Sequence, residues 1–394
     1  MHVYTMDEEF RRIDLIDQYE SFIWTERYSA VGDFELVVNS DRDMRRAFYN
    51  NTYVSIDESQ RLMRIDMVED SVDDEGRRML LVKGKSLEQR LTERLATPPA
   101  TSLVHPYTWR FSRTPSVGIR TMYQDVAFNN HRDPRENFTD TQLITTVEPG
   151  RIPELADVVT IQIDYMTLYE AIREVAVPYN IGFAILADNL DGPGRPLSFR
   201  VYNGYNRTAT QSQNAPVVFA PELDNLDSMR TLKSTADWRN VAYVSSKNFR
   251  QVEVYSDGAD ASSEGTGRRV LFLKLDDLEE DLTSAEEQAQ MIQRGQEELA
   301  KHKRVEIFDG EITQYSQYKY GQDYGLGDIV ELQDGEGNSN EMMVTEQIFV
   351  SDEEGERSYP TLQLYRYIQS GSWLGWNQTV EWASLGPEEW ADMP

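Results

Sequence analysis

Residues 20–39 constrain the fold of this chain more than any other stretch, because they form two short runs of alternating side chains around a turn. Phe22 and Trp24 occupy every second position of the first run, and Phe34 opens a similar run after Gly32-Asp33. Alternation at period two, with aromatic and β-branched residues, is typical of half-buried strands, and Gly-Asp is common turn chemistry. The stretch contains no His or Cys, so it predicts a paired strand that starts a barrel or sandwich rather than a catalytic device.

The composition excludes several classes of protein. The 394 residues suffice for about two to four packed units, and they include no cysteine, which excludes disulfides, thiolate metal sites and cysteine nucleophiles. The formal net charge of −29 argues against binding nucleic acid by neutralising phosphates. The acidic excess is heaviest after residue 270. This excess predicts a solvated surface.

The residue patterns favour neither a cofactor nor a membrane anchor. The four histidines, His2, His105, His131 and His302, lack metal-ligand spacing, so we expect no metal and no cofactor. Residues 181–187 are too short an apolar run to cross a bilayer, and charged residues interrupt the N-terminus, so we expect assembly in a cytoplasm.

One carboxylate pair could imitate the acids of a glycosidase. Asp323 and Asp328 flank an aromatic residue, but we favour a backbone-capping role for both because they lie in a glycine-rich turn.

The pattern of strands and helices divides the chain into five parts. Short strands dominate residues 1–98, the first β-barrel domain, and residues 99–213 alternate helices and strands in an α+β domain. A second β-barrel domain takes residues 214–258 and 305–370, and residues 259–304 are an inserted loop and helix. Ser284 and Glu287 predict a capping box for that helix. Residues 371–394 form a tryptophan-rich tail. The fold class is therefore mainly β with α+β parts.

Two segments carry a family resemblance. The first contains a W-x-x-R-Y…G-D-F-E-L pattern at Trp24, Arg27, Tyr28, Gly32, Asp33, Phe34, Glu35 and Leu36. The second contains Y-G-x-D-Y-x-L-G-D-x-V at Tyr320, Gly321, Asp323, Tyr324, Leu326, Gly327, Asp328 and Val330. Together they resemble the tail hub, or minor tail protein, of long-tailed phages (siphoviruses) that infect actinobacteria.

The resemblance implies a structural protein at the tip of the virion tail, without enzymatic activity. It implies two tube-like barrels per chain, a homotrimeric ring, and contacts with the distal tail protein ring, the tape measure protein and other tail-tip or receptor-binding proteins. DNA would pass through the lumen without specific binding. The acidic excess would then either line the lumen and let DNA slide or only solvate the surface, and the sequence leaves both open. The motif residues expected to hold the fold or its interfaces are Trp24, Arg27, Tyr28, Asp33, Phe34, Tyr320, Asp323, Tyr324, Gly327 and Asp328.

The C-terminal tail favours docking to a partner. Trp373, Trp376, Trp382 and Trp390 lie close together in it, and tryptophan anchors protein interfaces. Tryptophan also stacks on sugars, so a carbohydrate-binding or carbohydrate-cleaving tail-tip protein is an alternative function. A distal tail adaptor ring, which would contain six chains, is another. No further catalytic domain is expected.

Overall fold

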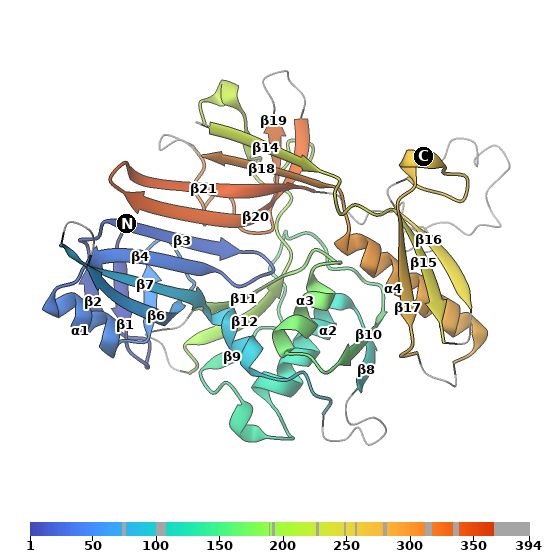
Figure 1. Ribbon diagram of the computed structural model, residues 1–394, viewed down its shortest axis with the longest axis horizontal. Helices are drawn as coiled ribbons and strands as arrows, with labels where there is room; N and C mark the ends of the chain where they lie inside the picture. Colours follow the sequence, from blue (N-terminus) through green and yellow to red (C-terminus); the bar gives the residue numbers. More distant parts are fainter. Residues whose placement is uncertain are drawn as a thin grey trace. The chain divides into compact units, whose positions relative to one another are not determined.

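The chain, seen in a computed structural model, is mainly β with α+β parts, as the sequence predicts (Figure 1). The structure describes residues 1–72, 76–99, 108–188, 190, 194–225, 228–247, 250–256, 258–278, 282–311, 317–333 and 339–365. Within these residues the first compact unit comprises Met1–Ser234 and Val305–Leu364, and the second comprises Thr235–Arg304 and Tyr365. The predicted docking tail, with Trp373, Trp376, Trp382 and Trp390, lies outside the described residues and stays a prediction.

The N-terminal part of the first unit is a run of antiparallel strands. Its elements are β1 (Val3–Met6), β2 (Arg12–Ile16), β3 (Ser21–Arg27), β4 (Asp33–Asn39), α1 (Arg42–Asn50), β5 (Tyr53–Ile56), β6 (Met63–Val72) and β7 (Arg78–Ser86). The predicted hairpin forms between β3 and β4, with Trp24 opposite Phe34. Phe22, Trp24 and Leu36 are fully buried, so the alternating pattern correctly identified the inward face.

The C-terminal strands of the first unit join the same sheet. They are β13 (Val218–Phe219), β14 (Ser228–Ser234), β18 (Val305–Glu311), β19 (Ile329–Gln333), β20 (Ser339–Asp352) and β21 (Gly355–Leu364). The hydrogen-bonded order is β14-β18-β21-β20-β3-β4-β7-β6-β5-β1-β2, with β13 and β19 off this path. β20 pairs with β19 along its first part and with β3 along its second, and its register with β21 shifts between Val344 and Glu346. The division into two separate barrels stays a prediction.

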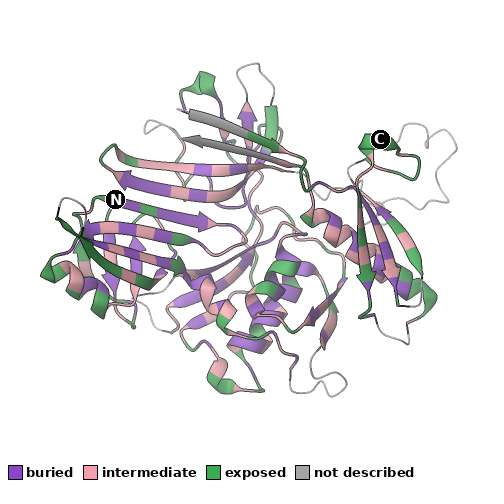
Figure 2. Ribbon diagram, viewed as in Figure 1, coloured by how far each residue is buried: buried purple, intermediate pink, exposed green. Residues whose placement is uncertain are grey.

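An α+β part completes the first unit. Its elements are η1 (Leu87–Glu93), β8 (Thr108–Arg113), α2 (Pro115–Tyr123), η2 (Gln124–Phe128), η3 (Pro134–Glu136), β9 (Thr141–Leu143), β10 (Val159–Asp164), α3 (Leu168–Ala176), β11 (Gly182–Ala187), β12 (Leu197–Tyr202) and η4 (Pro221–Leu223). β11 pairs with β12, and β8 pairs with β10. Figure 2 shows buried residues along β11 and β12 and on the inner faces of α2 and α3. Their side chains form one hydrophobic core, which also includes Met6, Phe10 and Leu62 from the N-terminal part.

The second unit is a three-stranded sheet with one helix. It contains β15 (Val241–Ser246), β16 (Gln251–Tyr255), η5 (Gly265–Gly267), β17 (Val270–Leu275) and α4 (Ser284–Lys301), and the strand order is β16-β15-β17. Val244 and Val254 pack against Met291 of α4 in one cluster. Gly295 also faces these valines, since a Cβ there would lie 2.8 Å from each.

Two details of this unit differ from the sequence prediction. β15 and β16 were expected in the second barrel, but they pair with β17 because their apolar side chains supply the surface that α4 needs to bury. The boundary predicted at residue 258 is wrong for these two strands. The capping box of α4 is formed by Thr283 and Glu286 instead of Ser284 and Glu287, because Ser284 is already the first helical residue and Thr283 is the N-cap.

Candidate functional site

The two motif segments of the sequence meet around Tyr28, which follows β3. The Tyr28 hydroxyl donates to the carbonyl oxygens of Asn180 and Tyr202, each at 3.1 Å. The ring is so close to Gly182 and Gly327 that an added Cβ would lie 2.1 and 2.3 Å from it. Gly327 also has a φ of +85°, which glycine adopts without strain. Tyr28 therefore connects β3, the α+β part and the turn before β19.

Asp328 caps the same turn from inside the protein. It is 2% exposed, and it accepts hydrogen bonds from Arg207 Nε at 2.6 Å and from the backbone nitrogens of Tyr205 at 2.7 Å and Gly325 at 3.0 Å. Burial raises the pKa of Asp328, although these donors act in the opposite direction. Asp323 accepts from the backbone nitrogen of Lys319 at 2.8 Å. Both carboxylates thus hold backbone, which leaves no free acid pair of the glycosidase type here.

Arg27 connects the hairpin to β20. Its guanidinium donates to Asp33 Oδ1 at 2.6 Å and to Glu346 Oε1 at 2.7 Å, and to the carbonyl oxygen of Val31 at 2.8 Å. Burial by itself would lower the pKa of Arg27, but the bonds and charges of Glu346 and Asp33 outweigh it and raise the pKa. Arg27 therefore links the first motif both to its own turn and to β20, a strand from the C-terminal part of the unit.

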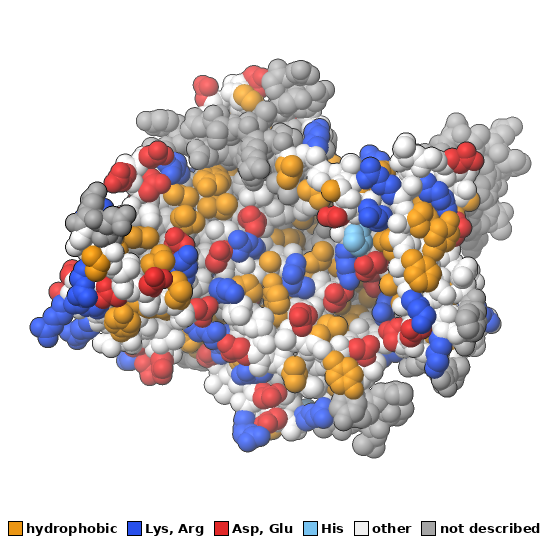
Figure 3. Space-filling view, in the orientation of Figure 1, with side chains coloured by type: hydrophobic (Ala, Val, Ile, Leu, Met, Phe, Trp, Pro, Cys, Tyr) orange, Lys and Arg blue, Asp and Glu red, His pale blue; other side chains and the backbone are white. Residues whose placement is uncertain are grey.

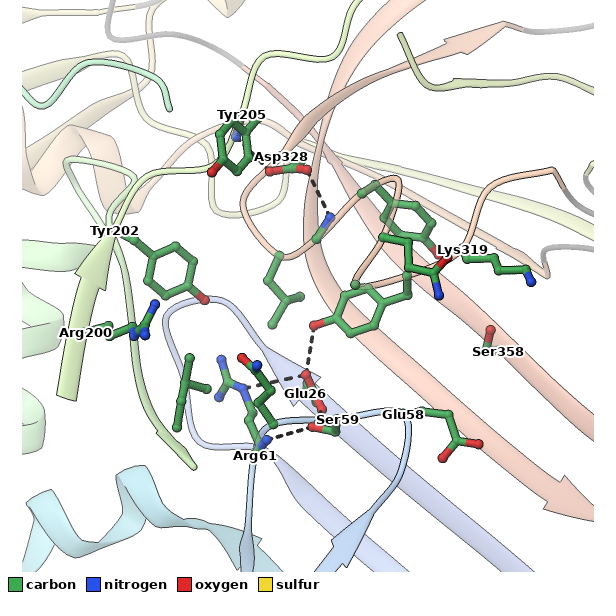
Figure 4. Close-up of a pocket in the computed structure, with 18 of the residues that line it drawn as sticks. Glu26, Glu58, Ser59, Arg61, Arg200, Tyr202, Tyr205, Lys319, Asp328 and Ser358 are labelled. Carbon is green, nitrogen blue, oxygen red and sulfur yellow. Dashed lines mark hydrogen bonds and ion pairs between the residues drawn. The ribbon is translucent and has the colours of Figure 1, made fainter. Parts of the chain in front are cut away.

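A buried charge network that the sequence analysis missed lies where these elements meet (Figure 4). Arg61 is 2% exposed, and it contacts Glu88 Oε1 at 2.9 Å and Glu26 Oε2 at 3.7 Å. It also donates to the carbonyl oxygen of Arg27 at 2.9 Å. Burial alone would lower the pKa of Arg61, but the surrounding negative charges, Glu88 foremost, raise it. Arg61 is thus a permanent cation between two acids.

Neighbouring side chains complete the coordination of the two acids. Glu26 accepts from Trp24 Nε1 at 3.0 Å, from the Tyr320 hydroxyl at 2.8 Å and from the hydroxyl of Ser59. Glu88 Oε1 accepts from the backbone nitrogen of Ile185 at 2.9 Å, while its Oε2 atom is buried without a hydrogen bond within the described residues. The network therefore ties together β3, η1, β11 and the segment before β19.

The sequence did contain a signal for Glu26. Glu26 follows Phe22 and Trp24 at every second position of β3, so the period-two pattern places its side chain on the buried face. A buried acid without a partner would be costly. Nothing in the local sequence identifies Arg61 as its partner or Glu88 as the second acid on Arg61, because both are distant along the chain.

A cavity of about 1290 Å³ opens beside this network. The wall is rich in tyrosine, and Figure 4 labels Tyr202 and Tyr205. Most of its residues lie in the segments 57–61, 144–151, 200–207, 318–328 and 356–358. The arginines of the wall already have acidic partners: Arg200 contacts Asp188 at 2.7 Å, and Arg151 pairs with Glu148. The wall combines polar and apolar side chains, and acids and bases balance along it.

Neither a metal cluster nor a spanning helix is found within the described residues. They contain no group of three or more His, Asp or Glu side chains that could hold a metal ion. None of their helices is long and apolar enough to cross a membrane.

Comparisons with known proteins agree with the resemblance in the sequence. Residues 1–361 match the family described as Siphovirus ReqiPepy6 Gp37-like protein. The tail protein from Neisseria meningitidis MC58 is 12% identical with a TM-score of 0.57, covering 95% of this chain and 98% of that one. The 43 kDa tail protein of prophage MuSo2 from Shewanella oneidensis is 14% identical with a TM-score of 0.54, covering 92% and 98%. The comparison with curated proteins gave no match. The chain has the fold of these phage tail proteins, and it belongs to the Siphovirus ReqiPepy6 Gp37-like family of siphovirus tail proteins.

Proposed function

We propose that this protein is the baseplate hub of a siphovirus tail, a homotrimeric ring that caps the tail tube and lets DNA pass. The pairing of β20 with β3 carries the proposal, since it joins the N-terminal and the C-terminal strands of the unit into one sheet. The buried Glu26–Arg61–Glu88 network reinforces the same joint. A continuous sheet that includes both ends of the unit suits a ring that must stay closed while DNA moves through it.

The proposed partners follow from this role. One face of the ring would contact the distal tail protein ring, and the lumen would hold the tape measure protein until ejection. DNA would pass without specific binding, which the net charge of −29 supports because acidic surfaces repel phosphates. Figure 3 shows acidic and basic side chains interspersed on the face that it draws, so the acidic excess is not gathered there. We propose that the protein acts structurally and not as an enzyme.

The number of copies at the tail tip tests the proposal. We expect a cryo-electron microscopy map of purified tails to contain three copies of this chain in a ring below the tube, with the distal tail protein above them. Six copies in the ring would identify the protein as the distal adaptor instead. Release of soluble fragments from host cell wall by the purified chain would contradict the non-enzymatic role.

A further inference from the structure

The second unit carries a sheet face that its helix leaves uncovered. α4 packs on the face formed by Val244, Val254 and their neighbours, and alternate residues of the three strands point to the other side. On that side Phe272 is 65% exposed and Val270 is 40% exposed. Figure 3 shows hydrophobic side chains gathered on the drawn face of this unit.

The strand register assembles an aromatic platform on this face. Tyr243 of the central strand lies directly opposite Phe272 on β17 and Glu253 on β16. Tyr255 is in the adjacent row, so three aromatic rings occupy neighbouring positions of one small sheet. Phe272 is exposed, and the half-buried Tyr243 and Tyr255 extend the aromatic surface beside it. Exposed apolar patches of this kind often mark binding sites.

A fixed polar group lies among these rings. Arg268 donates to the Tyr243 hydroxyl at 3.0 Å and to Glu253 at 3.1 Å, and its guanidinium lies 5.8 and 5.7 Å from the ring centres of Tyr243 and Tyr255. The Tyr255 hydroxyl donates to the same carboxylate of Glu253. The charges of the pair cancel locally, and Lys274 is likewise paired with Asp276 at 2.6 Å. The platform is therefore flat, aromatic, edged by hydrogen-bonding groups and without net charge.

We propose that this face binds an uncharged oligosaccharide. Sugar rings present flat C–H faces that stack on aromatic rings. Their hydroxyl groups can accept hydrogen bonds from Arg268 and donate hydrogen bonds to Glu253. The area supports this ligand over a second copy of the chain. Three strands of five or six residues cover about 15 by 20 Å, or roughly 300 Å². A stable protein interface needs about 800 Å² on each partner.

The neutral charge of the face also disfavours a polyanion, which would need unpaired cations. The proposal is independent of the hub role, since a hub with or without this activity would form the same ring.

Binding of the full-length chain to a panel of immobilised uncharged oligosaccharides (linear glucans, galactans, arabinans and mannans) tests the proposal. We expect at least one to bind, with affinity then measured by calorimetry. Phe272→Ala should weaken binding about tenfold or more, whereas Phe272→Tyr should keep it within about threefold, because tyrosine retains the stacking ring. Tyr49→Ala removes a comparably exposed ring (57% exposed) from α1 and should leave binding unchanged.

Three binding and stability results would overturn the proposal, and so would a change in oligomeric state. The first is binding to none of the oligosaccharides, or only to charged ones added to the panel. The second is equal binding by Phe272→Ala and the unaltered protein. The third is a large fall in melting temperature for Phe272→Ala, since that would show that another part of the protein covers the ring. A stable dimer that dissociates in Phe272→Ala would identify a second copy as the occupant instead.

Discussion

Replacing Arg61 by methionine should destabilise the first unit strongly. The substitution keeps an apolar stem of similar length but removes the cation that contacts Glu88 at 2.9 Å and Glu26 at 3.7 Å. Both acids are almost inaccessible, at 0% and 3% exposed, so their charges would stay buried without compensation. Breaking a buried ion pair on one side costs about 3–5 kcal/mol. For a unit of this size that corresponds to a fall of roughly 6–10 °C in melting temperature.

The measurement is thermal and urea unfolding at pH 7, with Arg12→Met as the matched control. Arg12 contacts Asp57 at 2.8 Å, but the two side chains are 43% and 42% exposed. An exposed pair of this kind contributes about 0–1 kcal/mol, so the control should melt within about 2 °C of the unaltered protein. A triple variant with Glu26→Gln, Arg61→Met and Glu88→Gln should recover much of the loss, because no buried charge remains uncompensated. Equal melting of Arg61→Met and Arg12→Met would refute the reasoning.

Three further predictions concern other contacts of the first unit. Trp24→Ala should lower the free energy of unfolding by about 3–5 kcal/mol because the side chain is fully buried. Ile23→Ala, on the exposed side of the same strand, should lower it little, and equal urea midpoints for the two variants would contradict the prediction. Gly327→Ala should cost about 1–3 kcal/mol through its positive φ and its contact with the Tyr28 ring, and Gly325→Ala, where a Cβ meets nothing within 4 Å, is the control for the same melting experiment. Burial would raise the pKa of Glu148, but Arg151 and Arg200 lower the pKa overall. The ionised Glu148 side chain therefore stabilises the folded protein above the unfolded pKa near 4.5, and this stabilisation is lost as the pH falls through the lower pKa of the folded state. Glu148→Gln should therefore be less stable than the unaltered protein at neutral pH, with a difference that shrinks below about pH 4.5 and would contradict the argument if it stayed constant.

Local patterns in the sequence predicted the elements better than their assignments to larger parts. The alternation in residues 20–39 identified the β3–β4 hairpin and its buried face, because the side-chain period of a strand is visible in any short window. The helix at α4 was also identified, but its capping box was placed one residue late. Ser284 and Thr283 both precede a glutamate at the required spacing, so the choice depends on where the backbone turns into the helix.

The grouping of strands could not be predicted in the same way. β15 and β16 have the composition of barrel strands, and only their packing against α4 and pairing with β17 place them in the second unit. The same is true of the candidate site. Glu26 was predictable as an inward-facing acid on β3, whereas its partner Arg61 and its neighbour Tyr320 reach it from distant segments.

The sequence by itself determined the class of this protein: a mainly β chain, without cysteine and strongly acidic, with two motif segments that identify a siphovirus tail family. Alternation, turn residues and motif spacing are local properties, and they survive in the chain whatever its tertiary structure. Only the tertiary structure decided that Tyr28 packs between two glycines, that Arg61 neutralises two buried acids, and that α4 covers one face of the three-stranded sheet and leaves Phe272 exposed on the other. These features depend on contacts between residues far apart in the chain, whose energies come from burial and not from any local pattern.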